Sequence, residues 1–464
     1  MDPADAFVNL YDRLSHIPAD LLGDWSELEE VQKTAAAVCA EVGRTGVLAE
    51  HWLSSPALDQ PERFGILLGL DLALLGAVGE TARLDARALD YLQVRFEMTG
   101  RLNDRSSGIL LPRRSSAHRP GEDPDSIDGF LHLLRIPSQL SENLQVCHVH
   151  ALHDLPKAPV RPGERELAPA PPLAVAQLPL LAERADVRWD TIDKPGGAFY
   201  TAAPEAARLE GRLGAALTAL DQSGAVLAVL PEGCLDDGLL EKWRELLRAT
   251  PQPEDSALTW LLLGTGPVRA AGPMPVSGRP PNRAVLLHRG GWLDPFLTQD
   301  KLSGFCFTTE KQTEYGIDLG GVKRDEYISH DPVITLLEAR SGRFAVQICE
   351  DVGRQERQRH LIAAGVTHLL VPVLAAPMWE HGWQAGAGQA LAVEIGTKAV
   401  VSNGLAITRF FEKEPAKTLL ITTVPPRRPE QYPTTDDMVR THHNPDAPAM
   451  TAVEDALTPR QTEW

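Results

Sequence analysis

Short apolar segments alternate with helical patterns through the C-terminal part of the chain, and this alternation constrains the fold more than any other feature. Ala225–Leu230, Phe344–Ile348 and His368–Val373 have the length and composition of buried strands. Leu239–Leu247, between the first two, carries apolar residues at helical spacing. Strands that alternate with helices are typical of α/β folds. We therefore expect an α/β domain over residues 173–424.

The rest of the chain differs in pattern. Residues 1–155 contain apolar residues mainly at helical spacing, which predicts a mainly helical domain without a recognisable motif. Within it, the polar stretch Arg101–Asp128 predicts a long loop. The dense prolines of residues 156–172 resist both helix and sheet and predict a semi-rigid linker. The polar, Pro-rich residues 425–464 predict an extended or disordered tail.

One cysteine follows directly after a predicted strand. Arg343–Gly353 reads as an apolar run, Cys349, two carboxylates and a glycine, before a charged helical segment. In open α/β sheets, ligands bind at the carboxyl ends of the strands, where Cys349 is expected to lie. The alternative for any single intracellular cysteine is a small buried apolar side chain. Cys349 alone therefore does not predict a catalytic site, which also requires other catalytic side chains near the thiol.

Two charged residues follow other predicted elements, one a strand and the other a turn. Glu232 ends the apolar stretch Val229–Gly233, and Lys301 follows a predicted turn. Taken singly, Glu232 is also compatible with a helix cap, and Lys301 with a surface cation. A thiol attacks a carbonyl or nitrile carbon as its thiolate, so it requires a base, and a fixed cation stabilises the developing negative charge. Because the sheet brings strand ends together, we expect Glu232, Lys301 and Cys349 to meet as base, cation and nucleophile.

These three positions carry a family resemblance. The Pro-Glu pair at Glu232, the later Lys301 and the Ile-Cys-Glu-Asp around Cys349 resemble the carbon–nitrogen hydrolase (nitrilase) superfamily, with intervals of 69 and 48 residues. The resemblance implies an α-β-β-α sandwich over residues 173–424, in which the Glu is the base, the Lys stabilises the tetrahedral intermediate and the Cys is the nucleophile. It also implies that no metal or organic cofactor is required, and that the sandwich pairs into a homo-oligomer.

The resemblance also suggests residues that position substrate. Family members often carry a second glutamate after the Lys, for which Glu310 fits the spacing better than Glu314. The expected oxyanion donors include the backbone N–H of Glu350. Trp379, His381 and Trp383 lie near where substrate-shaping residues often fall, although core aromatics beside a turn are the alternative. The Cys-Glu-Asp triplet resembles amidases and the glutaminase domain of glutamine-dependent NAD synthetases, but Gly353 replaces the Trp common there.

A short histidine cluster offers a different chemistry. Cys147-His148-Val149-His150 lies in an expected strand over residues 144–152, so that both histidines share one face. Two such histidines can bind zinc. The sequence nearby has no second cluster with metal-ligand spacing, so a solvent-facing or hydrogen-bonded pair is the preferred interpretation and no metal is predicted.

Charge and cysteine usage limit the compartment and the partners. The 464 residues carry a formal net charge of −18, which argues against nucleic acid as the partner. Five scattered cysteines without a CxxC pattern argue against a disulfide framework and favour a reducing, cytoplasmic location. The first 20 residues lack the apolar core of a signal peptide, and the apolar stretch Ile66–Val78 is too short to span a membrane.

Together these features predict a hydrolase of non-peptide carbon–nitrogen bonds that forms a thioester on Cys349. The expected substrate is a small amide, and the sequence leaves nitrile and carbamoyl substrates open. The alternative is a regulatory or scaffold protein, non-catalytic or activated by a partner, that uses a nitrilase-like domain for assembly.

Overall fold

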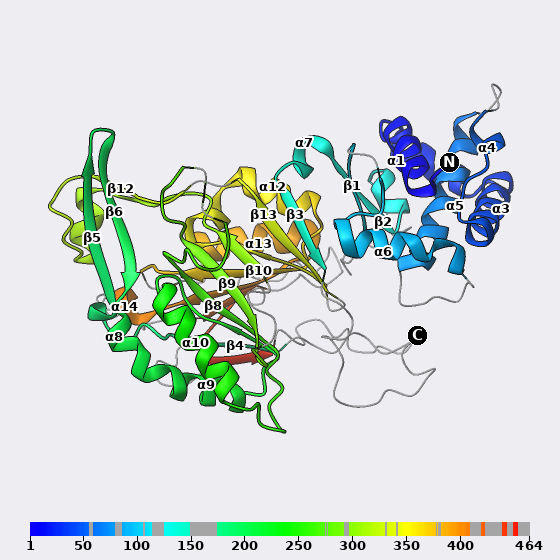
Figure 1. Cartoon of the computed structure of the whole chain (residues 1–464). Helices are drawn as coiled ribbons and strands as arrows, with labels where there is room; N and C mark the ends of the chain where they lie inside the picture. The colour runs from blue at the N-terminus through cyan, green and yellow to red at the C-terminus, as the bar shows by residue number, and fades with distance from the viewer. Residues whose placement is uncertain are drawn as a thin grey trace. The chain divides into compact units, whose positions relative to one another are not determined.

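The structure is a computed structural model of the chain (Figure 1). It describes all residues except 55–58, 79–85, 105–106, 114–124, 149–173, 274, 276, 292–296, 330–331, 340–341, 377, 379–381, 409–418, 423–438, 443–448 and 453–464. The chain divides into two compact units. The first unit comprises Met1–Pro169, Leu337–Arg343 and Ala363–Gly365, and the second comprises Ala170–Leu336, Phe344–Ile362 and Val366–Trp464. The predicted linker, residues 156–172, lies almost entirely outside the described residues.

Helices make up most of the described N-terminal sequence of the first unit. Asp2 caps the first of them, because its carboxylate accepts from the amides of Ala4 and Asp5 at 3.0 and 3.2 Å. A Gly46 with φ 73° ends the third, as left-handed glycines often do. The helices are α1 (Pro3–Leu14), α2 (Ala19–Ser26), α3 (Glu29–Thr45), α4 (His51–Ser54), α5 (Gln60–Val78), η1 (Ala86–Leu89) and α6 (Asp90–Thr99).

A small antiparallel sheet follows these helices. It pairs β1 (Gly108–Pro112) with β2 (Leu133–Pro137), so the prediction of a loop over Arg101–Asp128 was wrong at β1. The apolar Ile109-Leu110-Leu111 is too short to stand out among polar neighbours, and pairing with β2 makes it a strand. The remaining elements are η2 (Ile127–Phe130), α7 (Ser138–Ser141) and β3 (Leu144–His148). His150 lies outside the described residues.

Asp71 ties α5 to this small sheet. It is buried, and its carboxylate accepts from the backbone amides of His132 and Leu133, each at 2.9 Å. The imidazole of His132 lies 2.7 Å from the same carboxylate, which raises the pKa of that histidine. This buried acid in the apolar part of α5 therefore holds the start of β2.

The second unit contains two larger sheets. In the first, the order is β10-β9-β8-β7-β4-β19, with β4, β7 and β8 parallel. In the second, the order across this unit is β18-β17-β16-β15-β14-β13, with β14, β15 and β16 parallel. The strands of the first sheet are β4 (Ala174–Gln177), β7 (Leu227–Val229), β8 (Trp260–Gly266), β9 (Arg283–His288), β10 (Leu297–Asp300) and β19 (Ala449–Ala452). Those of the second are β13 (Ile334–Ala339), β14 (Gly342–Val346), β15 (His368–Val373), β16 (Lys398–Asn403), β17 (Leu419–Thr422) and β18 (Val439–His442).

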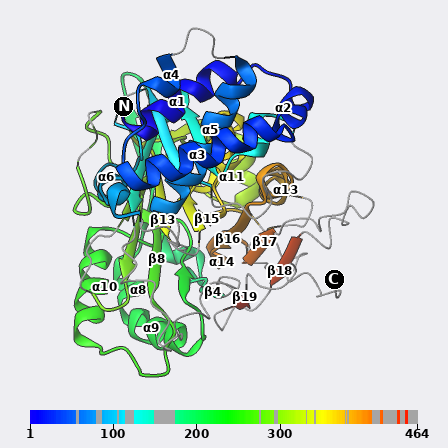
Figure 2. The ribbon, with the colours of Figure 1, turned by 90° about the vertical axis from the view of Figure 1, so that its right-hand side faces the viewer.

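Helices pack against both sheets. α9 (Leu213–Gln222) and α10 (Asp237–Ala249) lie beside β8 in Figures 1 and 2, and their apolar faces join the core of that sheet. α13 (Trp383–Ile395) contacts β16 and β17. The described residues thus form a mixed α/β fold with several sheets, whereas the four-layer α-β-β-α order stays a prediction. The other helices of this unit are η4 (Arg184–Asp186), α8 (Ala206–Leu209), η5 (Glu210–Arg212), α11 (Thr309–Tyr315), η6 (Cys349–Gly353), α12 (Gln355–Ala363) and α14 (Leu405–Thr408).

A third sheet in this unit is absent from the sequence prediction. Its order is β11-β12-β6-β5, and the antiparallel hairpin of β5 (Val187–Lys194) and β6 (Gly197–Pro204) forms its long arm (Figure 1). The shorter strands are β11 (Cys306–Phe307) and β12 (Arg324–Glu326). Much of β5 is exposed, so it lacks the apolar alternation that identifies a half-buried strand in a sequence.

Two further findings concern the tail and the membrane. β18 and β19, within the predicted extended or disordered tail, pair with β17 and β4. Across the described ranges, none of the helices has both the length and the apolar character needed to span a bilayer.

Candidate active site

The ends of several strands meet around one cavity in the second unit. Glu232 follows β7, and its backbone N–H donates to the Val373 carbonyl at the end of β15 at 3.2 Å. The Ser402 hydroxyl on β16 donates to the Val229 carbonyl on β7 at 3.0 Å, which joins the two larger sheets. The structure brings Glu232, Lys301 and Cys349 together here, and all three line the cavity.

Two glycines let β8 support the turn that carries Glu232. The Thr265 carbonyl accepts from the amides of Gly233 and Leu235 at 2.9 and 3.1 Å. Gly264 has φ 73°, and a Cβ there would overlap the Pro231 carbonyl. A Cβ on Gly266 would overlap the Leu235 carbonyl. Only glycine permits so close an approach of two backbones.

Lys301 is placed by the pairing of β9 with β10. Arg283 on β9 makes a bidentate ion pair with Asp300 at 2.6 and 3.0 Å. The next residue, Lys301, then donates its backbone N–H to the Asn282 carbonyl at 2.7 Å. This arrangement directs the Lys301 side chain inward, where it is 2% exposed.

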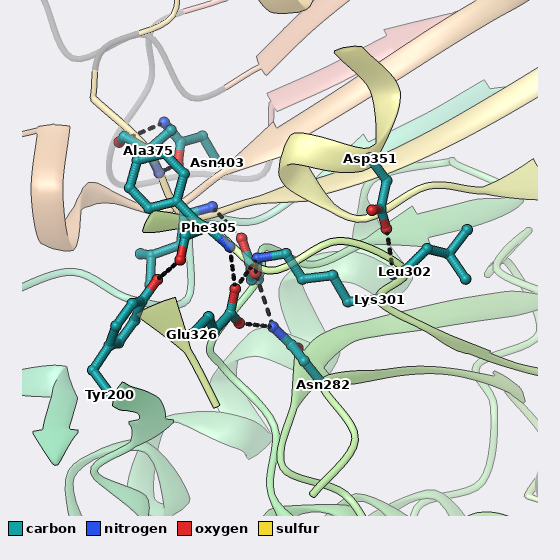
Figure 3. A network of polar contacts seen from close by, with 11 residues as sticks. Tyr200, Asn282, Lys301, Leu302, Phe305, Glu326, Asp351, Ala375 and Asn403 are labelled. Atoms are coloured by element: carbon teal, nitrogen blue, oxygen red, sulfur yellow. Dashed lines mark hydrogen bonds and ion pairs between the residues drawn. The ribbon is translucent and has the colours of Figure 1, made fainter. Parts of the chain in front are cut away.

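The buried ammonium lies between two carboxylates. Lys301 Nζ donates to Glu232 Oε1 at 2.8 Å and to Glu326 Oε2 at 2.7 Å (Figure 3). The Asn282 amide donates to both glutamates at 2.9 Å, and the Phe305 backbone N–H donates to Glu326 at 3.0 Å. Burial alone lowers the Lys301 pKa, but the two carboxylates outweigh it and raise the pKa well above its usual value. Lys301 is therefore a fixed cation.

Cys349 begins η6, shortly after β14, and has a strained backbone conformation. Its φ is 51°, and it is the one non-glycine residue with a positive φ among those that the structure describes. Such strain persists only where the surroundings enforce it, and it is common at active sites. Asp351 helps to enforce it, because its carboxylate accepts the Leu302 amide at 2.9 Å and so ties the turn to the segment after Lys301 (Figure 3).

The thiol contacts the candidate base. Glu232 lies beside this thiol, and its carboxylate accepts from the Leu374 backbone N–H at 3.1 Å. Burial raises the pKa of the Cys349 thiol well above its usual value, Glu232 raises that pKa further, and Lys301 lowers it. The resting nucleophile is thus a neutral thiol with a base within reach.

The cavity beside Cys349 has a volume of about 450 Å³, a size that suits a small-molecule ligand. Glu350 and Glu314 line it, whereas Glu310 is an exposed residue of α11 that does not. Glu310 lies next to the N-cap of that helix, and a hydrogen bond with Thr308 lowers its pKa. Trp379 and His381 lie outside the described residues, and Trp383 lines the cavity.

Sequence reasoning missed Glu326 as a partner of Lys301. It lies 25 residues after the lysine, on β12 of the third sheet. The available signal is weak: β12 alternates a buried Arg324, an exposed Asp325 and a buried Glu326. A carboxylate at a buried strand position needs a cation or several donors, which is a reason to look for one.

Within the described residues, no group of three or more His, Cys, Asp or Glu side chains could hold a metal ion.

Comparison with known proteins gives only distant similarities. No family model matches the sequence, and no curated protein matches it either. A glutamine-dependent NAD+ synthetase from Acinetobacter baumannii is 14% identical with a TM-score of 0.33, over 51% of this chain and 39% of the synthetase. An amidase from Nesterenkonia sp. is 16% identical with a TM-score of 0.33, over 51% of this chain and 78% of the amidase.

A third matched structure is Nit3 of Saccharomyces cerevisiae, a member of branch 10 of the nitrilase superfamily. It is 14% identical with a TM-score of 0.33, over 50% of this chain and 75% of Nit3. The matched structures thus include members of the superfamily that the sequence resembles. The chain spans well under half the length of the synthetase. Identity and TM-score are both low, so we infer the function from the site's own residues.

Proposed function

We propose that this chain hydrolyses the carbon–nitrogen bond of a small amide through a thioester on Cys349. The observation that carries the proposal is the arrangement of a strained, cavity-lining cysteine, a carboxylate in contact with its thiol and a buried lysine held by two carboxylates. Each of these groups has the role that acyl transfer to a thiol requires.

The first half-reaction transfers the acyl group to sulfur. Glu232 takes the thiol proton as Cys349 attacks the carbonyl carbon, so the negative charge passes from the Glu232 carboxylate to the carbonyl oxygen without a free thiolate at rest. An ammonium group has three donors, and Lys301 uses two of them on Glu232 and Glu326. We assign the third donor, with the backbone N–H of Glu350, to the oxyanion. Collapse breaks the C–N bond, and protonated Glu232 gives its proton to the leaving amine.

The second half-reaction regenerates the thiol. Glu232, now a carboxylate again, takes a proton from water as the water attacks the thioester carbon. Collapse of this second tetrahedral intermediate releases the acid, and the proton returns from Glu232 to the sulfur. The balance is amide plus water to carboxylic acid plus ammonia or amine.

The experiment is ammonia release from a panel of glutamine, asparagine, simple aliphatic amides, ureido acids and nitriles. We expect release by the wild-type protein and a loss of at least about a thousandfold in Cys349→Ala, as found when other catalytic nucleophiles are removed. Cys306→Ala is the matched control, because Cys306 is a partly exposed thiol that does not line the cavity. Equal turnover by wild type and Cys349→Ala would overturn the proposal.

Absence of turnover leads to a second measurement. Alkylation of Cys349 by iodoacetamide, followed by peptide mass spectrometry, separates two cases. If Cys349 reacts faster than Cys306, the nucleophile is active and the panel lacked the substrate or an activating partner. If Cys349 does not react, the non-catalytic assembly role replaces the hydrolase.

A further inference from the structure

Aromatic side chains line one side of the cavity. Trp189, Phe305 and Tyr315 are partly exposed there, over the buried rings of Tyr200 and Phe307. Phe307 lies at the centre, with ring centroids 5.0 to 5.8 Å from those of the other four, and its contacts with them are edge-to-face. These residues belong to β5, β6, α11 and the segment around β11, so the third sheet supplies most of this wall. Rings that support one another in this way form a rigid surface.

A tryptophan lies on the cavity at another element. Trp383 is the first residue of α13, lines the cavity and remains 44% exposed. Gly353 lines the cavity beside it, and a Cβ on Gly353 would lie 3.5 Å from the Trp383 ring. Because Gly353 has no side chain, it leaves this face of the indole uncovered. A large apolar ring left open inside a cavity is a surface that a ligand can cover.

The charges of the cavity limit the ligand further. Its lining carries four glutamates against two lysines and one arginine. Lys301 is already held by Glu232 and Glu326, and Arg354 is 2.9 Å from Glu350. The remaining cation, Lys311, lies 4.4 Å from the centre of the Phe305 ring. An additional carboxylate on the substrate would enter a site that already holds an excess of negative charge.

We propose that the substrate is an uncharged amide whose acyl side carries a flat aromatic group, held between Trp383 and the wall formed by Trp189, Phe305 and Tyr315. This inference rests on the proposed function and names the substrate class for it. Aromatic groups prefer offset-stacked and edge-to-face contacts, and this cavity offers both a free indole face and ring edges. The gap at Gly353 gives the group room to reach the indole.

The experiment compares amides of matched size. Phenylacetamide, cyclohexylacetamide, acetamide and 4-carboxyphenylacetamide all release ammonia, and differ in planarity, size and charge. We expect kcat/KM to be highest for phenylacetamide, about three- to tenfold above its cyclohexyl counterpart, because only a flat ring can stack. The carboxylated amide is expected to be the poorer of the two aromatic substrates.

Variants locate the preference at Trp383. Trp383→Ala is expected to remove the planar preference, so that phenylacetamide and cyclohexylacetamide are hydrolysed at similar rates, and Trp383→Phe is expected to keep most of it. Gly353→Leu is expected to impair phenylacetamide more than acetamide, because it covers the indole. Val393→Ala is the matched control, since Val393 is 59% exposed on the same helix and does not line the cavity.

Binding to Cys349→Ala distinguishes failure of this inference from failure of the hydrolase proposal. Saturation-transfer NMR measures whether that variant binds phenylacetamide in preference to cyclohexylacetamide, and whether adding Trp383→Ala abolishes the preference. Binding without turnover in wild type would leave the aromatic site standing and overturn the hydrolase. Turnover of both amides at equal rates, unchanged by Trp383→Ala, would overturn the aromatic site and leave the hydrolase. If the protein shows neither binding nor turnover of these amides, both proposals are overturned.

Discussion

At the scale of single residues, Glu326 sets the charge around Lys301. Lys301 is a monocation with two carboxylates at 2.8 and 2.7 Å, so the cluster keeps one net negative charge. Glu326→Gln keeps an acceptor but removes that charge. We expect kcat to fall about tenfold to hundredfold, less than when an oxyanion donor itself is removed. Because Glu326 raises the Lys301 pKa, its loss lowers that pKa, and the alkaline limb of the pH–rate profile should move to lower pH.

Asp325→Asn is the control for this variant, because Asp325 is the exposed neighbour on the same strand. A Glu326→Gln protein with an unchanged alkaline limb would mean that Glu326 supports only the fold. Steady-state rates from neutral pH to about pH 10, with thermal melts of each variant, separate the two cases.

The buried carboxyl of Asp351 is expected to make the free energy of unfolding depend on pH. Burial raises its pKa from 3.8 to about 6, against the opposing effects of the Leu302 amide and Lys301. The folded protein therefore binds a proton on the Asp351 carboxyl more tightly than the unfolded chain does. This proton stabilises the folded protein at low pH, and that stabilisation is lost as the pH rises from about 4 through about 6. We expect the free energy of unfolding of Asp351→Asn, relative to wild type, to rise by about 2 kcal/mol between pH 4 and pH 7.

Urea unfolding at pH 4, 5, 6 and 7 measures this difference. Asp255→Asn, a substitution of an exposed loop carboxylate, is the control and should show a flat difference. A flat difference for Asp351→Asn as well would show that the Asp351 carboxylate ionises as easily in the folded protein as in the unfolded chain.

The sequence predicted some site residues because of where they fall relative to strands. Glu232 and Cys349 each follow an apolar strand of the α/β alternation and Lys301 follows a predicted turn, and a sheet that brings strand ends together then implies that they meet. Glu326 belongs to a three-residue strand in a sheet with no such pattern, so only the folded contacts identify it. Glu310 satisfied the spacing after Lys301, but a helix cap and an exposed helix face account for its position. Spacing along the chain does not reveal which side of a helix faces the cavity.

At the scale of elements, the approach of β8 to the Glu232 turn depends on Gly266. A Cβ there would overlap the Leu235 carbonyl, which is backbone and cannot rotate away. Gly266→Ala is expected to lower the free energy of unfolding by about 1–3 kcal/mol and to reduce kcat, because the turn that carries Glu232 must shift. Urea unfolding and steady-state kinetics measure the two effects.

Gly214→Ala provides the matched substitution in α9, where a Cβ meets nothing within 4 Å. There alanine is the better helix former, and we expect a gain of about 0.5–1 kcal/mol. If both substitutions leave stability and kcat unchanged, the close approach of the two backbones does not position Glu232.

The elements that the sequence did not predict share a physical cause. β1 and the β5–β6 hairpin are stabilised by strand pairing, and neither presents a long apolar face of its own. Helix α10 was predicted near its observed bounds, because its apolar periodicity is local. The wall of the cavity that we assign to aromatic recognition comes mostly from the unpredicted sheet, so the sequence predicted the proposed catalytic residues better than the residues proposed to bind the substrate.

At the scale of the whole molecule, the first unit is assembled from segments far apart in the sequence. It includes Leu337–Arg343 and Ala363–Gly365 beside the N-terminal 169 residues. The Arg343 guanidinium is fully buried, pairs with Glu338 at 2.7 Å and donates to the Pro112 carbonyl of β1 at 2.8 Å, across 231 residues of sequence. A linear division into a domain 1–155 and a later domain cannot anticipate such a contact.

This buried cation yields a last prediction. Arg343→Ala leaves the buried Glu338 without this cation and Pro112 without this donor, and removing one partner of a buried pair costs about 3–5 kcal/mol. We expect that loss in urea unfolding, with faster amide hydrogen exchange in β1 and β2. Arg188→Ala is the control, since the Arg188–Asp190 pair is exposed and such pairs contribute at most about 1 kcal/mol. The double variant Arg343→Met with Glu338→Leu should recover much of the loss, because it removes both charges together. Exchange in β1 that is unchanged in Arg343→Ala would show that the N-terminal sheet does not depend on this late segment of the chain.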